Sequence, residues 1–109
     1  MQTSITSNGK DTLVKFEGSL DVSCQESLKN ELAKQVQPED QRLVVDLSLV
    51  TFIDSACLGV FVSTLKNLKA KNRQLVFVAP QEEVRSIFQI TRLDRLFMIV
   101  DSLKDLPPA

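Results

Sequence analysis

The stretch that decides the fold covers residues 42–59, RLVVDLSLVTFIDSACLG, where one hydrophobic pattern gives way to another. Its first part, residues 42–47, is a short β-branched run, which is typical of a strand buried on both faces. Further on, apolar residues recur at helical spacing, namely Leu58, Phe61, Val62, Leu65 and Leu68. This second pattern predicts an amphipathic helix over residues 58–70. The sequence therefore predicts a strand that leads directly into a helix, with Asp54 and Ser55 at the junction.

The junction combines a hydroxyl group with the start of a helix. Asp54 and Ser55 are good helix-starting residues, because their side chains accept hydrogen bonds from the free amides of a first turn. The Ser55 hydroxyl would then lie near unpaired amides and the positive end of a helix dipole, which favour a phosphoryl group. Taken alone, the residue types favour an ordinary N-cap over a phosphoryl site.

The rest of the chain alternates between strands and helices after an opening hairpin. Asn8 and Gly9 favour a tight turn between two antiparallel strands. Pro80 favours the start of a helix, and residues 37–40 end an earlier one. The pattern predicts strands over 13–16, 43–47, 75–78 and 97–100, helices over 23–36, 55–70 and 81–90, and a helical turn over 101–106.

This order predicts a single α/β domain over residues 1–109. Strand–helix alternation implies parallel pairing, and the hairpin adds an antiparallel edge. We expect a mixed, mostly parallel sheet of about five strands, with residues 43–47 at its centre and the helices mainly on one face. Ligand-competent loops of such sheets lie at the carboxyl ends of the strands, which is where Asp54 and Ser55 fall.

Composition argues against several classes of function. The 109 residues are 43% hydrophobic and 25% charged, with a net charge of -1 and no cluster of basic residues. Nucleic-acid binding is therefore not expected. No apolar run approaches the roughly 20 residues of a membrane span, and residues 1–4 lack the features of a signal peptide. We expect a cytoplasmic protein that does not bind membranes.

The chain contains no histidine, which excludes a histidine general base and a Ser-His-Asp triad. No catalytic constellation, metal-ligand spacing or phosphate-cradling glycine loop is visible, so we expect neither an enzyme nor a cofactor or metal. Cys24 and Cys57 lie far apart in the sequence, and two thiols in the cytoplasm are expected to be free.

Several segments carry a resemblance to one protein family. Residues 54–60, DSACLGV, resemble the Asp-Ser-(Ser/Thr/Ala)-Gly-Leu-Gly signature of STAS domains, the family of bacterial anti-sigma factor antagonists. FEGSLD at 16–21 and LVVDLS at 43–48 resemble the family's segment before the first helix and its central strand. The closing strand, helix and final strand are matched by residues 75–80, 84–88 and 93–97, so the resemblance covers nearly the whole chain.

The resemblance implies a binding protein switched by phosphorylation. In its unphosphorylated form it would bind an anti-sigma factor that is also a serine kinase, and so free the sigma factor. The kinase would inactivate it by phosphorylating Ser55, and a serine phosphatase would restore it. The partner-binding residues would be Asp21, Asp54, Ser55, Ala56, Cys57 and Leu58. We expect a monomer or a weak dimer.

Some alternatives stay open at this point. STAS domains also act in partner switching that controls secretion, motility, metabolism or carbon uptake rather than a sigma factor. A phosphoaspartate receiver with Asp46 or Asp54 as acceptor is disfavoured, because only one acid follows the first strand and no lysine follows the last. Asp21 is also a plausible helix cap, and the apolar stripe beginning at Leu58 is more often core than contact surface.

Two positions in the signature need separate expectations. Cys57 stands where the family usually has glycine. We expect it to be a small buried side chain, although a thiol at a helix amino terminus can also have a lowered pKa and be redox-sensitive. Gly59 keeps the family residue, and we expect it to allow close approach of the helix to the sheet.

Overall fold

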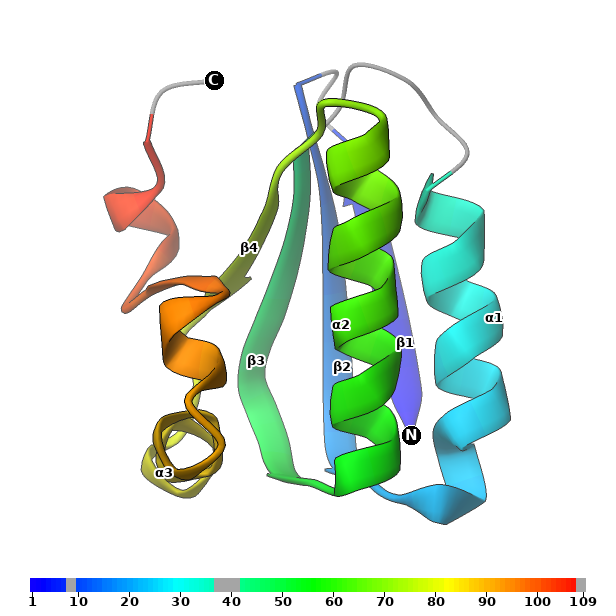
Figure 1. Cartoon of the computed structure of the whole chain (residues 1–109), viewed down its shortest axis with the longest axis vertical. Helices are drawn as coiled ribbons and strands as arrows, with labels where there is room; N and C mark the ends of the chain where they lie inside the picture. The colour runs from blue at the N-terminus through cyan, green and yellow to red at the C-terminus, as the bar shows by residue number, and fades with distance from the viewer. Residues whose placement is uncertain (8–9, 37–41, 108–109) are drawn as a thin grey trace.

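The central strand of the sheet is the segment that the sequence singled out. In the computed structural model, which describes residues 1–7, 10–36 and 42–107, β3 (Arg42–Ile53) pairs in parallel with β2 (Asp11–Leu20) and with β4 (Leu75–Val78). β1 (Gln2–Ser7) adds an antiparallel edge to β2, and β5 (Met98–Val100) extends the other side in parallel. The order β1-β2-β3-β4-β5 confirms the predicted mixed sheet and its central strand (Figure 1).

The helices begin and end close to where the hydrophobic patterns place them. α1 covers Gln25–Val36 after a short 3-10 turn, η1 (Val22–Cys24), and α2 covers Ser55–Ala70. α3 covers Glu82–Ile90, and the 3-10 turns η2 (Leu93–Arg95) and η3 (Leu103–Asp105) follow it. The expected Asn8-Gly9 turn and the expected helix end at residues 37–40 lie outside the described residues.

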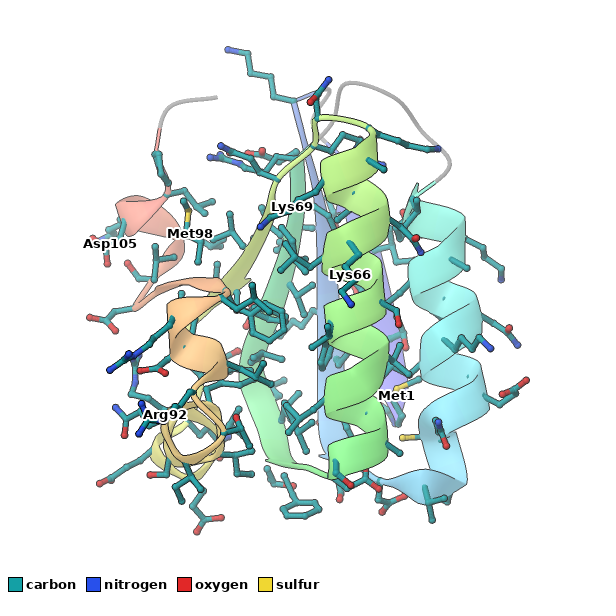
Figure 2. The ribbon with its side chains drawn as sticks, in the orientation of Figure 1. Met1, Lys66, Lys69, Arg92, Met98 and Asp105 are labelled. Carbon is teal, nitrogen blue, oxygen red and sulfur yellow. The ribbon has the colours of Figure 1, made fainter. Side chains whose placement is uncertain are left out.

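All three helices contribute to one core on the same face of the sheet. Leu28 and Leu32 of α1, Phe61 and Leu68 of α2 and Phe88 of α3 join buried residues of β2, β3 and β4 in a single cluster. Figure 1 shows α1 and α2 side by side in front of the sheet, and Figure 2 shows Lys66 on the outer side of α2. The prediction of helices mainly on one face is confirmed. None of the helices in the described ranges has the length and apolar character needed to cross a membrane.

The opposite face of the sheet has a smaller core. Val44, Val76 and Val78 are buried there, and Leu106 from the carboxyl-terminal segment packs against them. Arg42 holds this segment in place, since its guanidinium group donates to the carbonyl of Pro107 (2.7 Å) and pairs with the carboxylate of Asp11 (2.7 Å). The segment after β5 therefore covers apolar surface that the helices leave open.

Phe77 of β4 is the centre of the main core. Its ring lies 5.0 Å from that of Phe61, 5.5 Å from that of Phe88 and 4.8 Å from that of Phe97, measured between centroids. The contacts with Phe61 and Phe97 are edge-to-face, a geometry that aromatic pairs prefer. One fully buried ring thus joins β4 to α2, to α3 and to the segment before β5.

Candidate functional site

The register of two parallel strands brings the two predicted acidic residues together. Leu20, the last residue of β2, is paired with Ile53, the last residue of β3. Asp21 and Asp54 are the next residues along the chain, and the amide of Asp54 donates to the carbonyl of Leu20 (2.9 Å). η1 and α2 therefore begin next to each other at the lower edge of the sheet in Figure 1.

Asp21 acts as the N-cap of η1. Its carboxylate accepts hydrogen bonds from the amide of Ser23 (3.0 Å) and from the hydroxyl groups of Ser23 and Ser19. These hydrogen bonds stabilise the charged form, so they lower the pKa of Asp21 below its ordinary value of 3.8. The carboxylate is consequently ionised at neutral pH. The cap role that the sequence allowed is what the structure shows.

Asp54 is the N-cap of α2, and Ser55 is the first residue of the helix. The Asp54 carboxylate accepts a hydrogen bond from the amide of Cys57 (2.8 Å), while the Asp54 carbonyl accepts from the amide of Leu58 (3.0 Å). The Ser55 side chain is exposed. Across the described ranges, the amides of Ser55 and Ala56 have no hydrogen-bond partner, as expected at the start of a helix. The cap is thus made by Asp54, which leaves the Ser55 hydroxyl free.

The remaining residues of the predicted partner surface lie at different depths. Ala56 is half-buried, whereas Cys57 (0% exposed) and Leu58 (6% exposed) belong to the main core. Their side chains pack inward, so the accessible side chains of this turn are those of Ser55, Ala56 and the two aspartates. Phe61, which follows on the same stripe, is also core.

The environment of Cys57 decides between the two expectations for this thiol. Burial away from water, and to a lesser extent the adjacent Asp54 carboxylate, raise its pKa to about 12. The expected burial is therefore confirmed, and the lowered pKa is wrong. The positive end of the helix dipole is outweighed by the cost of placing a thiolate in the core beside a carboxylate.

Two exposed apolar side chains, which the sequence reading did not select, flank the two caps. Val22 directly follows Asp21 and is 73% exposed, and Phe52 lies two residues before Asp54 and is 46% exposed. They place apolar surface at the edge of the sheet that carries Ser55. The exposure of Val22 could have been predicted from the sequence, because Asp21-Val22-Ser23 is a polar turn that contains a large apolar residue.

Irregular pairing explains why Phe52 points outward. Gly18 is paired with Val50, but Ser19 is paired with Phe52, so Thr51 is an extra residue on β3. Gly18 has φ +101°, a conformation that L side chains rarely adopt. A bulge of this kind changes which face the following side chains occupy. It leaves both Thr51 and Phe52 exposed and returns Ile53 to the core.

The expectation for Gly59 is wrong. Gly59 is exposed, and a Cβ added to it would meet nothing within 4 Å. It lines a groove of about 340 Å³ between α1 and α2, along with Lys29, Ala56 and Ser63. Gly59 therefore lies on the side of α2 that faces this groove, and it does not mediate a close contact with the sheet.

Gly59→Ala is accordingly expected to stabilise the protein. Glycine costs about 0.5–1 kcal/mol relative to alanine inside a helix, and no neighbouring atom opposes the added methyl group. Urea unfolding followed by far-UV circular dichroism measures the change in the free energy of unfolding. Gly18→Ala is the matched control and should destabilise, because its backbone has positive φ. A loss of stability in Gly59→Ala would show that this glycine is needed for packing after all.

A phosphoaspartate receiver needs an accessible aspartate to accept the phosphate, and Asp46 does not meet this requirement. Its side chain is buried within β3, and its carboxylate accepts a hydrogen bond from the amide of Ser48 (2.8 Å). Within residues 1–7, 10–36 and 42–107, no group of three or more His, Cys, Asp or Glu residues could hold a metal ion. Ser55, by contrast, is exposed at the junction that the structure assembles.

Comparisons with known proteins agree with this architecture. The STAS domain family model matches residues 2–106. The anti-sigma-B factor antagonist of Staphylococcus aureus (strain NCTC 8325 / PS 47) is 32% identical over 94 residues, covering 86% of this chain and 87% of that protein.

Solved structures show the same fold. An anti-sigma factor antagonist from Mycobacterium paratuberculosis has a TM-score of 0.86 at 25% identity, covering 95% of this chain and 88% of that chain. The phosphorylated form of the Bacillus cell fate determinant SpoIIAA has a TM-score of 0.73 at 15% identity, covering 95% of each chain. The five-stranded mixed sheet with three helices on one face is thus a known architecture, and this chain belongs to the STAS domain family.

Proposed function

We propose that this protein is a regulatory binding protein, not an enzyme, and that phosphorylation of Ser55 controls its binding. Unphosphorylated, it binds an anti-sigma factor with serine kinase activity and thereby frees a sigma factor. The kinase phosphorylates Ser55 and ends the interaction, and a serine phosphatase restores it. The observation that carries the proposal is the exposed Ser55 hydroxyl, which stands at the first position of α2 and is not used for capping.

The local chemistry is suited to a phosphate. A phosphoserine at this position carries about -1.5 to -2 charges at neutral pH. The amides of Ser55 and Ala56 and the helix dipole stabilise this charge within the protein. Because Asp54 already holds the first turn in place, the phosphate can be added without unfolding α2. The switch therefore changes the charge of a preformed surface.

The proposed partner surface combines three kinds of chemistry. Ser55 supplies a neutral hydroxyl, Asp21 and Asp54 supply carboxylates, and Val22 and Phe52 supply apolar area. None of the ion pairs among the described residues involves either aspartate, so both charges are available to a partner. A partner that buries the neutral hydroxyl loses affinity when this group becomes an anion, because the anion must be desolvated and is repelled by nearby carboxylates.

The known proteins support the choice of partner. The Staphylococcus aureus relative is named an antagonist of an anti-sigma-B factor, and SpoIIAA, which has the same fold, exists in a phosphorylated form. We extend these properties to this chain as part of the proposal. A serine kinase that controls another process would satisfy the same geometry, and identification of the kinase distinguishes the two circuits.

Phosphate transfer to Ser55 is the direct test. Incubation of the folded protein with the partner kinase and ATP is expected to place one phosphate on Ser55, located by phosphopeptide mapping. Ser55→Ala should abolish labelling, whereas Ser63→Ala should leave it unchanged, because Ser63 is an exposed serine of the same helix away from the first turn. Full labelling of folded Ser55→Ala would contradict the proposal. Ser55 would then be only the first residue of the helix, with no role as phosphate acceptor.

A further inference from the structure

Two cysteines from different helices meet at one backbone atom. Cys24 ends η1 and Cys57 lies in the first turn of α2, and both are free thiols. The Sγ atom of Cys24 lies 3.3 Å from the carbonyl oxygen of Asp21, and the Sγ atom of Cys57 lies 3.5 Å from the same oxygen. The two sulfur atoms are therefore neighbours. The Cys24 thiol is also among the groups that raise the pKa of Cys57.

The two thiols differ in their access to solvent. Cys57 is 0% exposed and Cys24 is 8% exposed, on the turn that links β2 to α1. With a pKa raised to about 12, Cys57 is almost entirely protonated at neutral pH and is a poor first nucleophile. Cys24 is thus the thiol that a small reagent reaches first, and Cys57 reacts second.

We propose that Cys24 and Cys57 form a reversible disulfide bond when the folded protein meets a low-molecular-weight disulfide such as oxidised glutathione. The Cys24 thiol loses its proton and attacks one sulfur of the reagent, whose S–S bond breaks and releases one thiolate, which takes up a proton. Cys57 then loses its proton and attacks the Cys24 sulfur of the mixed disulfide, which releases the second glutathione thiol. One reagent disulfide becomes two thiols, and two protein thiols become one disulfide.

The bond would join the start of α1 to the start of α2 beside the candidate site. Asp21, whose carbonyl contacts both sulfurs, precedes η1, and Ser55 lies two residues before Cys57. Oxidation would therefore fix the relative positions of the two caps. This bond formation depends only on the two thiols, whereas any effect of the bond on partner binding rests on the proposed function.

Intact-mass measurement tests the proposal without a kinase. The folded protein is incubated with oxidised glutathione at neutral pH, and free thiols are alkylated at intervals. We expect a monomer lighter by two hydrogen atoms, with a Cys24–Cys57 link in the peptide map, which a dithiol reductant reverses. The thermal unfolding midpoint of this oxidised form, followed by circular dichroism, should be higher than that of the reduced form.

Single alanine variants assign the two roles. Cys57→Ala should accumulate one glutathione on Cys24, because no second thiol releases it. Cys24→Ala should lose its remaining free thiol at least about tenfold more slowly than Cys57→Ala does, because Cys57 is buried and protonated. Both substitutions keep a small side chain in the core, and folding is checked by circular dichroism.

Several results would overturn the proposal. These are glutathione retained on each cysteine of the wild type, a disulfide between two chains, and modification of Cys57 before Cys24. Thiol loss that proceeds only at the rate of global unfolding would also overturn it. A disulfide that forms in a protein whose Ser55 is never phosphorylated would leave this inference standing and would contradict the proposed function alone.

Discussion

Ser55→Asp is expected to weaken binding to the proposed partner kinase by about 1–2 kcal/mol or more, which is roughly a 5- to 30-fold rise in Kd. The substitution places a carboxylate where the proposed complex buries a neutral hydroxyl, so the anion must lose water on binding. It also adds a third acidic side chain to the turn that already contains Asp21 and Asp54. The measurement is a calorimetric titration of the purified kinase with each variant.

Loss of folding cannot account for this effect, because an acidic residue in the first turn of a helix is favourable. Ser55→Ala should bind like the wild type, since it removes the acceptor and adds no charge. Ser63→Asp is the matched control, with the same new charge on the same helix away from the turn, and its affinity should change little. Equal affinity of wild type and folded Ser55→Asp would mean that the hydroxyl is not part of the binding surface.

Phe77→Ala is expected to have the largest effect on stability. Removing a fully buried ring that contacts Phe61, Phe88 and Phe97 should lower the free energy of unfolding by about 3–5 kcal/mol. Native domains are stable by only about 5–15 kcal/mol, so the thermal midpoint should fall by more than about 10 °C. Far-UV circular dichroism is the suitable probe, because the chain has neither Trp nor Tyr.

Phe52→Ala serves as the control for this substitution. It removes the same ring from an exposed position, and its effect on stability should stay within about 0.5 kcal/mol. Similar losses in the two variants would contradict the assignment of Phe77 as the centre of the core. A small loss in Phe77→Ala would show that the surrounding rings close the cavity.

The sequence was sufficient wherever one periodicity holds over a whole element. Residues 75–78 and 55–70 were predicted with the bounds that β4 and α2 have, because their apolar patterns are uninterrupted and Asp54 and Pro80 are strong boundary signals. The position of Ser55 at the start of a helix followed from the same reasoning. These features depend on local residue types, which a sequence contains in full.

The sequence was insufficient where distant contacts decide the outcome. β2 and β3 are longer than the predicted 13–16 and 43–47, because bulges let both strands continue with a changed alternation. Because of the same irregularity, the exposure of Phe52 could not be predicted from the alternation of apolar residues. The position of Cys57 at a helix start suggested a lowered pKa, but the packing of η1 over it raises the pKa instead. The role expected for Gly59 was wrong because Gly59 lines a groove that α1 helps to form, and the position of α1 could not be read from the local sequence.

The pairing of Leu20 with Ile53 has a consequence for how a modifying enzyme can recognise this protein. The two strand ends are far apart in the chain, so the caps, the apolar flanks and the Ser55 hydroxyl come together only after β2 and β3 have paired. A synthetic peptide with the DSACLGV motif contains the serine but lacks the Leu20 carbonyl that binds the Asp54 amide. Under the proposed function, we expect the specificity determinant to be a conformational epitope, so that the motif in an unrelated or unfolded chain is a poor substrate.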